Sequence, residues 1–72
     1  MDYEMQMFIE NCELEDIEVT VIRENADYYV CDLEGDIRDF RDVEWAVNDA
    51  DMRTIHFKLY EIGYATITVG LA

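Results

Sequence analysis

The chain has 72 residues, 51% of them apolar, and a formal net charge of −13 at pH 7. This length and composition suit one small domain, 1–72, with a packed core, and the charge would repel nucleic acid and anionic membranes, so we exclude both as direct partners. The sequence contains no run of about 18 apolar residues and no secretory signal at its start, so we expect a cytoplasmic protein without a membrane segment.

In chain order, three strands are predicted first. Apolar and polar residues alternate along 5–9, which indicates a first strand. A longer alternation along 16–23 predicts a second strand, and "YYVCDL" at 28–33 predicts a third. The intervening 24–27, "ENAD", has the Asn and Asp of a turn, so the second and third strands are expected to form a hairpin.

A helix is predicted next, from Ile37 to about Ala50. Gly35 interrupts the alternation, and Asp36 has the side chain of a good N-cap residue. The predicted inner face of this helix is made of four apolar residues at helical spacing: Phe40, Val43, Val47 and Ala50. Trp45 falls almost opposite this face, among charged residues.

The last third of the chain alternates again, in two segments separated by a turn at Gly63. In the first segment Ile55, Phe57 and Leu59 point to one side, and the second is "YATITVGL". The resulting order is β-β-β-α-β-β. It predicts an α+β fold in which one helix packs on one face of a mostly antiparallel sheet of four to five strands.

The negative charge is concentrated in the first 51 residues, which carry 17 acidic and three basic residues, a net charge of −14. The remaining residues, 52–72, carry a net charge of +1. Such self-repulsion destabilises a compact state and exceeds what solubility requires of a small domain. The excess charge therefore favours a basic partner, although a solvated acidic surface without a partner is the usual fate of such a run.

Rows of carboxylates on a rigid scaffold present the kind of negative charge that a nucleic-acid backbone presents. Asp16 and Glu18 are expected on one face of a strand, and Asp39 and Asp42, and in turn Asp42 and Asp49, along one side of the helix. The full predicted partner-binding set lies within 13–18 and 32–51: Glu13, Glu15, Asp16, Glu18, Asp32, Glu34, Asp36, Asp39, Asp42, Glu44, Trp45, Asp49 and Asp51.

Trp45 belongs to this set because an exposed tryptophan is the commonest kind of interface hot spot. The sequence leaves two alternatives to partner contact open for the ring. Either a neighbouring segment of the same chain covers it, or a second copy of the chain does.

Metal sites and catalysis are not predicted. "DLEGD" and "NDAD" do not match the EF-hand pattern, and Cys12, Cys31 and His56 lack zinc-site spacing and a fourth ligand. A domain of this size has little room for the cleft that raises the pKa of a catalytic carboxyl group. His56 is predicted mid-strand, away from any orienting carboxylate, and the two cysteines are expected to be free thiols. We therefore expect no enzyme and no cofactor.

Four short segments carry a resemblance to a known family. They are "EVTVI" (18–22), "YY" (28–29), "DF" (39–40) at the predicted helix start, and "TIHFKL" (54–59). Over about 18–59 their order resembles the small acidic uracil-DNA glycosylase inhibitor of Bacillus phages. The resemblance implies a dimeric DNA mimic whose phenylalanine, here Phe40, contacts the DNA-intercalating loop of the enzyme. In that family a carboxylate follows this phenylalanine, whereas Arg41 follows it here.

Size and charge also resemble phage-encoded DNA mimics as a group, whose targets include uracil-DNA glycosylase, histone-like nucleoid proteins such as HU, restriction enzymes and CRISPR effectors. We therefore predict a binding protein that occupies the DNA-binding surface of a basic host protein in the cytoplasm. A homodimer is expected as well, because 54–71 offers a nearly neutral face. The alternative is a non-mimic interaction protein with a mainly apolar contact, such as an RNA polymerase inhibitor or a small adaptor.

Overall fold

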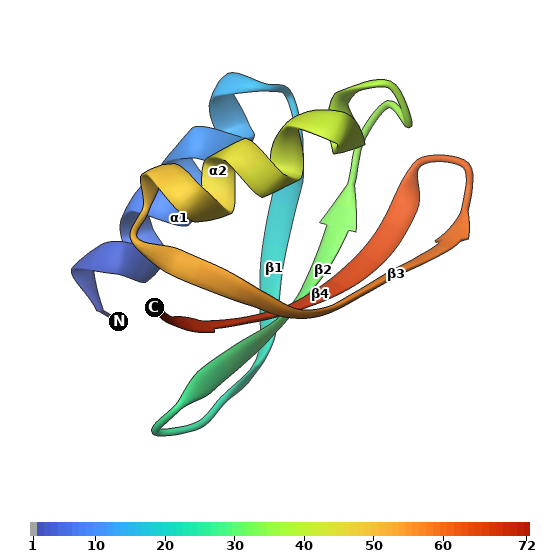
Figure 1. The fold of residues 1–72 in the computed structure, drawn as a ribbon. Helices are drawn as coiled ribbons and strands as arrows, with labels where there is room; N and C mark the ends of the chain where they lie inside the picture. The colour runs from blue at the N-terminus through green and yellow to red at the C-terminus, as the bar shows by residue number, and fades with distance from the viewer. Residues whose placement is uncertain (1) are drawn as a thin grey trace.

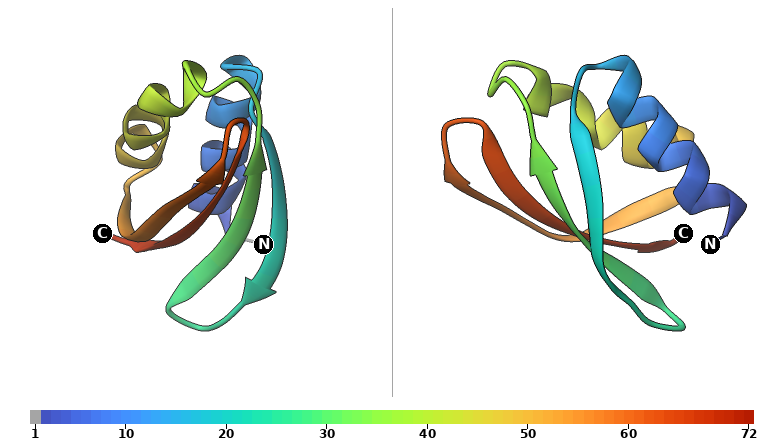
Figure 2. Two further views of the ribbon diagram at one scale, coloured as in Figure 1. Left: turned by 90° about the vertical axis from the view of Figure 1, so that its right-hand side faces the viewer. Right: turned by 180° about the vertical axis from the view of Figure 1, so that it is seen from behind.

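The computed structural model describes residues 2–72, which form a four-stranded sheet with two helices on one of its faces (Figures 1 and 2). The elements are α1 (Tyr3–Leu14), β1 (Glu18–Glu24), β2 (Tyr28–Glu34), the 3-10 helix η1 (Asp39–Asp42), α2 (Val43–Asp49), β3 (Met52–Glu61) and β4 (Tyr64–Leu71). The predicted α+β class and antiparallel sheet are confirmed. The predicted single helix and its element order are wrong, because the order is α-β-β-α-β-β.

The error lies at the N-terminal end, where Met5, Met7 and Ile9 were expected to form a strand. This segment is the helix α1, and its buried residues recur at helical spacing: Met5, Phe8, Asn11 and Cys12. Met7 and Ile9 are half-buried beside this face. Three alternating apolar residues are too short a pattern to outweigh the helical period of the buried residues, in a segment rich in the helix formers Met and Glu.

The hairpin of β1 and β2 forms as predicted. Its first strand begins at Glu18 instead of at Asp16, because Asp16 has a left-handed backbone conformation (φ 59°) in the turn after α1. The register runs from Glu18 opposite Glu34 to Glu24 opposite Tyr29, with one irregularity between Val21 and Arg23. On β2, the alternate residues Tyr29, Cys31 and Leu33 are buried.

The helix predicted at 37–50 is shorter and interrupted. Residues 39–42 form η1 and residues 43–49 form α2. The carboxylate of Asp36 does not cap a helix here; it accepts hydrogen bonds from the backbone N–H (2.9 Å) and the guanidinium of Arg38, which hold a turn before η1. The predicted inner face is correct, since its four members are all buried: Phe40, Val43, Val47 and Ala50.

The strand order is β1-β2-β4-β3, so β4 lies between β2 and β3. The connection from β2 through α2 to β3 is therefore a split β-α-β unit. It makes β1 and β3 the two edges of the sheet. Every side chain of β3 except that of Met52 is exposed, so the face of the sheet away from the helices and the β3 edge are both open surfaces.

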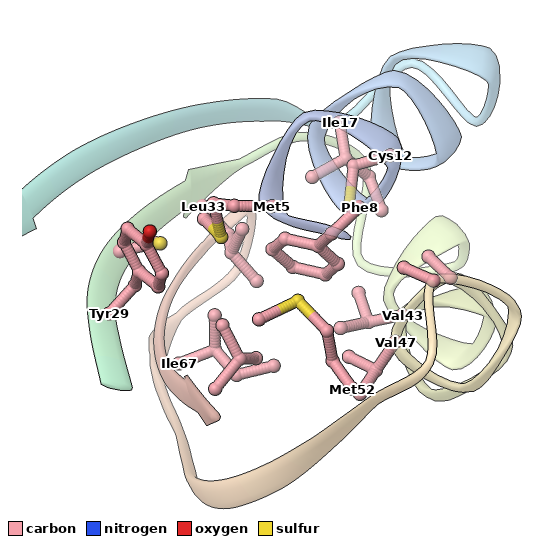
Figure 3. Close-up of a cluster of buried hydrophobic side chains, with 14 of the residues drawn as sticks. Met5, Phe8, Cys12, Ile17, Tyr29, Leu33, Val43, Val47, Met52 and Ile67 are labelled. Carbon is pink, nitrogen blue, oxygen red and sulfur yellow. The ribbon is translucent and has the colours of Figure 1, made fainter. Parts of the chain in front are cut away.

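The hydrophobic core fills the space between the helices and the sheet (Figure 3). Its largest fully buried side chains come from α1, the residue before β1, the sheet and α2: Phe8, Met5, Ile17, Leu33, Ile67, Val47 and Val69. The buried side chain of Asn11 donates a hydrogen bond to the backbone carbonyl of Ala46 (3.2 Å), which joins the two helices. No helix in residues 2–72 is long and apolar enough to cross a bilayer.

Cys12 on α1 and Cys31 on β2 are free thiols, and both are buried. Burial raises the pKa of each thiol to about 12. At neutral pH both are therefore protonated and contribute to the core as small apolar groups.

Gly63→Ala is expected to destabilise the protein by about 1–3 kcal/mol. Gly63 has a φ of +85°, and a Cβ at this position would lie 2.9 Å from the carbonyl oxygen of Gly35. Urea unfolding measures the change in the free energy of unfolding. Ile62→Ala, in the same turn and 84% exposed, is the control and should change it little. Equal midpoints for the two variants would contradict the close approach.

Candidate functional site

Three connections of the chain meet at one end of the sheet, in the upper part of Figure 1: 15–17, 35–38 and 62–63. The backbone N–H of Gly35 donates to the carbonyl oxygen of Gly63 at 3.0 Å. A Cβ on Gly35 would lie 3.1 Å from the carbonyl oxygen of Asp16. These close approaches hold the side chains that border the three connections at the same end of the molecule.

Three carboxylates lie in one line across the sheet at this end. Glu18 on β1 is opposite Glu34 on β2, and Tyr64 on β4 separates Glu34 from Glu61 on β3. We call Glu18, Glu34 and Glu61 the acidic row. All three are exposed, and the register places them on the face opposite to the buried Leu33 and Ala65, which the helices leave open. From strand spacing, Glu18 and Glu34 are about 5 Å apart and Glu34 and Glu61 about 10 Å apart at their Cβ atoms.

The acidic row is a destabilising arrangement. Like charges directly opposite each other on a sheet repel, and within residues 2–72 the observed ion pair joins Arg38 to Asp36, not to a member of the row. That pair is short (2.7 Å), and its hydrogen bonds lower the pKa of Asp36 to about 2. The row itself therefore presents negative charge to solvent.

Further acidic groups surround the row. Glu13, Asp16 and Glu18 border a shallow hollow of about 350 Å³ beside Ile17. Asp32, one step inward on β2, accepts a hydrogen bond from the hydroxyl of Tyr64 (3.0 Å), which raises the pKa of Tyr64. Among residues 2–72, no group of three or more His, Cys, Asp or Glu side chains is placed to hold a metal ion.

The carboxylates of η1 and α2 lie apart from the acidic row, on the helical side of the molecule. Asp39 and Asp42 are half-buried, and Glu44 is exposed. The carboxylate of Asp49 accepts a long hydrogen bond from the side chain of Asn11 (3.4 Å). They do not form the even row along a single helix that the sequence predicted, because Asp39 and Asp42 belong to η1.

Trp45 is 47% exposed on α2, on the side away from the core, as the helical periodicity predicted. The chain itself therefore leaves about half of the ring uncovered. Asp51 lies in the turn that follows α2, with a left-handed backbone (φ 56°), and its carbonyl accepts a hydrogen bond from the N–H of Ala72.

The β3 edge is largely apolar, in contrast to the acidic end of the sheet. Four of its large apolar or aromatic side chains are 40–54% exposed: Ile55, Phe57, Leu59 and Tyr60. Beside them a groove of about 510 Å³ runs between β3 and the helical layer, with Phe40, Phe57 and Ile67 among its apolar lining and Arg41 and Arg53 among its polar lining.

Phe40, the residue to which the family resemblance assigns a contact with an enzyme, lines this groove. Its side chain is 9% exposed and packs edge-on against Phe57, with the ring centres 6.5 Å apart.

No protein-family model, curated protein or solved structure matches this chain. Interpretation of the site therefore rests on its own geometry.

The thirteen predicted residues fall into two separate groups. The acidic end of the sheet brings together Glu13, Glu15, Asp16, Glu18, Asp32, Glu34 and Asp36, whereas Asp39, Asp42, Glu44, Trp45, Asp49 and Asp51 follow the helical side. The prediction missed Glu61, which completes the acidic row but belongs to the nearly neutral end of the sequence. The feature that could have revealed its position is the β3–β4 hairpin, because the register of this hairpin places Glu61 beside Tyr64.

Chemically, the acidic end offers hydrogen-bond acceptors and negative charge on a rigid, open surface. Such a surface complements Arg and Lys side chains, which form charge-assisted hydrogen bonds with carboxylates. His56 lies opposite Thr68 on the open face of the sheet, remote from the acidic row, and both thiols are buried.

Proposed function

We propose that this protein is a phage-type DNA mimic, a binding protein and not an enzyme, that covers the DNA-binding surface of a basic cytoplasmic host protein. The acidic row and its neighbours Glu13, Asp16 and Asp36 form the primary contact. The target class comprises histone-like nucleoid proteins, uracil-DNA glycosylase, and restriction or CRISPR effectors. Such proteins bind DNA through Lys and Arg side chains that would meet carboxylates here in place of phosphates.

The single observation that supports this proposal most is Glu18 directly opposite Glu34, with Glu61 in the same line. Folding brings these charges together at a cost to stability. A basic partner would offset the cost on binding, because its cations neutralise the row. A purely solvating surface needs no such alignment.

The hydrogen-bonded sheet holds the three carboxylates of the acidic row on a rigid scaffold. Each member of the row sits on a strand whose backbone is fixed by its neighbours, and the Gly35–Gly63 contact fixes the ends of those strands. Duplex DNA likewise presents its phosphates on a stiff scaffold, with one charge per roughly 1.7 Å of helix axis. A pre-organised acidic surface loses little conformational entropy on binding. Its electrostatic field also accelerates association with a basic partner.

Trp45, with Glu44 and Asp49, forms a second surface on the helical side. An exposed ring flanked by carboxylates suits a contact with a cationic or amphipathic partner surface. We assign it to a secondary contact, which a target that wraps around the domain would reach.

A non-mimic interaction protein, such as an RNA polymerase inhibitor or an adaptor, is the second candidate. The exposed apolar side chains of β3 and the groove beside Phe57 favour it. An apolar contact on this edge would tolerate salt and would not compete with DNA, whereas contact through the acidic row would be weakened by salt and displaced by DNA.

Retention from a host lysate on the immobilised protein tests the two candidates together. The proposal expects retained basic DNA-binding proteins that are released by duplex oligonucleotide. Retained proteins that stay bound in the presence of excess oligonucleotide and high salt would favour the second candidate and contradict the mimic.

A further inference from the structure

The β3 strand is an open sheet edge with apolar side chains and nearly balanced charge. It pairs with β4 along one side, and its other side is the end of the sheet. An edge strand presents a row of backbone N–H and C=O groups that a further strand can pair with. Its own charged residues, Arg53, Lys58 and Glu61, have a net charge of +1.

We propose that a second copy of this chain pairs antiparallel to β3 about a twofold axis at Phe57. The two sheets would then form one continuous eight-stranded sheet, with both β3 strands at its centre. The proposal concerns the opposite edge from β1; of the acidic row it uses Glu61 alone and leaves Glu18 and Glu34 for the host target.

The register follows from the faces of the strand. Residues directly opposite each other in an antiparallel pair lie on the same face of the sheet, so a twofold axis must coincide with a residue, not with a peptide bond. With the axis at Phe57, the two Phe57 rings are adjacent, and Arg53 faces Glu61 of the second copy, because both residues lie on the open face of the sheet. The last pair is an ion pair that occurs twice in the dimer.

The neighbouring registers are poorer. An axis at Lys58 would place two lysines opposite each other, and an axis at His56 would not bring Arg53 opposite Glu61, so the ion pair would be lost. The irregularities in β3, between Thr54 and His56 and between Leu59 and Glu61, flank the regular segment on both sides. The regular segment therefore contains Phe57, and each half of the pair includes one irregularity from each copy, so Arg53 and Glu61 stay in register.

Charge also excludes the other edge of the sheet. Self-pairing of β1 would bring the acidic segment 1–51 of one copy, with Glu18 and Glu24 on the edge strand itself, against the same segment of the other. Most other surfaces would bring together residues of the segment 1–51, whose net charge is −14. On β3 the second copy meets little repulsion and covers apolar side chains.

The dimer would also close the groove beside β3. Phe57 and Leu59 lie opposite the buried residues Ile67 and Ala65, which places them on the helix-facing side of the sheet. The corresponding side chains of the second copy would emerge on that same side, next to Phe40 and Phe57. The edge-on pair of these two rings would then extend into a cluster across the twofold axis.

Sedimentation equilibrium over a wide concentration range tests the dimer. The wild-type protein is expected to reach twice the monomer mass of 8.5 kDa. Phe57→Lys should abolish dimerisation, whereas Ile22→Lys, an exposed apolar residue on the β1 edge, should not. A wild-type protein that stays monomeric, or a Phe57→Lys variant that dimerises normally, would overturn the proposal.

A charge swap tests the register. Arg53→Glu alone should weaken the dimer about tenfold or more, because two attractive pairs become repulsive, and the double variant Arg53→Glu/Glu61→Arg should restore wild-type dimerisation. Both residues are exposed, so circular dichroism should show unchanged folding. A double variant no better than the single one would overturn the register centred on Phe57.

Discussion

Phe8→Ala is expected to destabilise the protein by about 3–5 kcal/mol, the usual cost of removing a buried phenylalanine from a core. Phe8 is fully buried between the helices and the sheet (Figure 3). A domain of 72 residues has a total stability of roughly 4–11 kcal/mol. The variant should therefore lose a large share of its stability, which urea unfolding followed by far-ultraviolet circular dichroism would measure.

Leu14→Ala is the matched control, since Leu14 ends the same helix and is 75% exposed. It should change the free energy of unfolding by less than about 0.5 kcal/mol. The two variants together distinguish the helix α1 from a strand at 5–9. In a strand, Phe8 would lie on the opposite face from Met5, Met7 and Ile9, whereas in the helix it is buried with Met5. Similar stability in the two variants would contradict the buried helix.

The double variant Glu18→Gln/Glu34→Gln is expected to be slightly more stable than the wild type and a much poorer binder. Removing two opposed charges should raise the free energy of unfolding by roughly 0.2–1 kcal/mol. Each lost charge-assisted hydrogen bond to the partner costs about 1.5 kcal/mol or more. Two such losses weaken the affinity about a hundredfold or more. Urea unfolding and titration against the retained host protein would measure the two effects.

Glu24→Gln/Asp27→Asn is the control for this variant. It removes the same two charges from the turn between β1 and β2, at the far end of the hairpin from Glu18. If overall charge alone drove association, both double variants would weaken binding equally. Equal losses would therefore contradict a specific role for the acidic row, as would a loss of stability in Glu18→Gln/Glu34→Gln.

The fold could be predicted where one pattern extended over a whole element. The alternations along β1, β2, β3 and β4 are each long enough to identify a strand, and the inner face of η1 and α2 was read correctly from four residues. The first helix could not be identified from the spacing of Met5, Met7 and Ile9, because period 2 and period 3.6 differ little over five residues. Phe8 and Cys12 carried the helical signal.

The candidate site was predictable in composition and not in geometry. The sequence indicates that 32–51 is acidic, but Asp32 and Glu34 end a strand while Asp39 and Asp42 form a 3-10 helix. The folded chain therefore sends these residues to different surfaces. Glu61 joins the acidic row through strand pairing between segments distant in sequence, and such pairing depends on the register of the hairpins.

The unequal distribution of charge along the sequence corresponds to two different regions of the folded sheet. Acidic residues gather at the end of the sheet where β1 and β2 meet the loops, and the edge strand β3 keeps its apolar side chains and its positive residues. We propose two different contacts, which share only Glu61 of the acidic row. One is an acidic contact with a basic protein, and the other is a strand contact with a second copy.

The most direct test of the proposed function is displacement of fluorescently labelled duplex DNA from the retained host protein, followed by anisotropy as this protein is added. The DNA-mimic proposal predicts full displacement at low salt, with an apparent affinity that falls steeply between about 50 and 200 mM salt. Glu18→Gln/Glu34→Gln should displace DNA far less well than the wild type. Binding that leaves the DNA in place, in a ternary complex insensitive to salt, would contradict it.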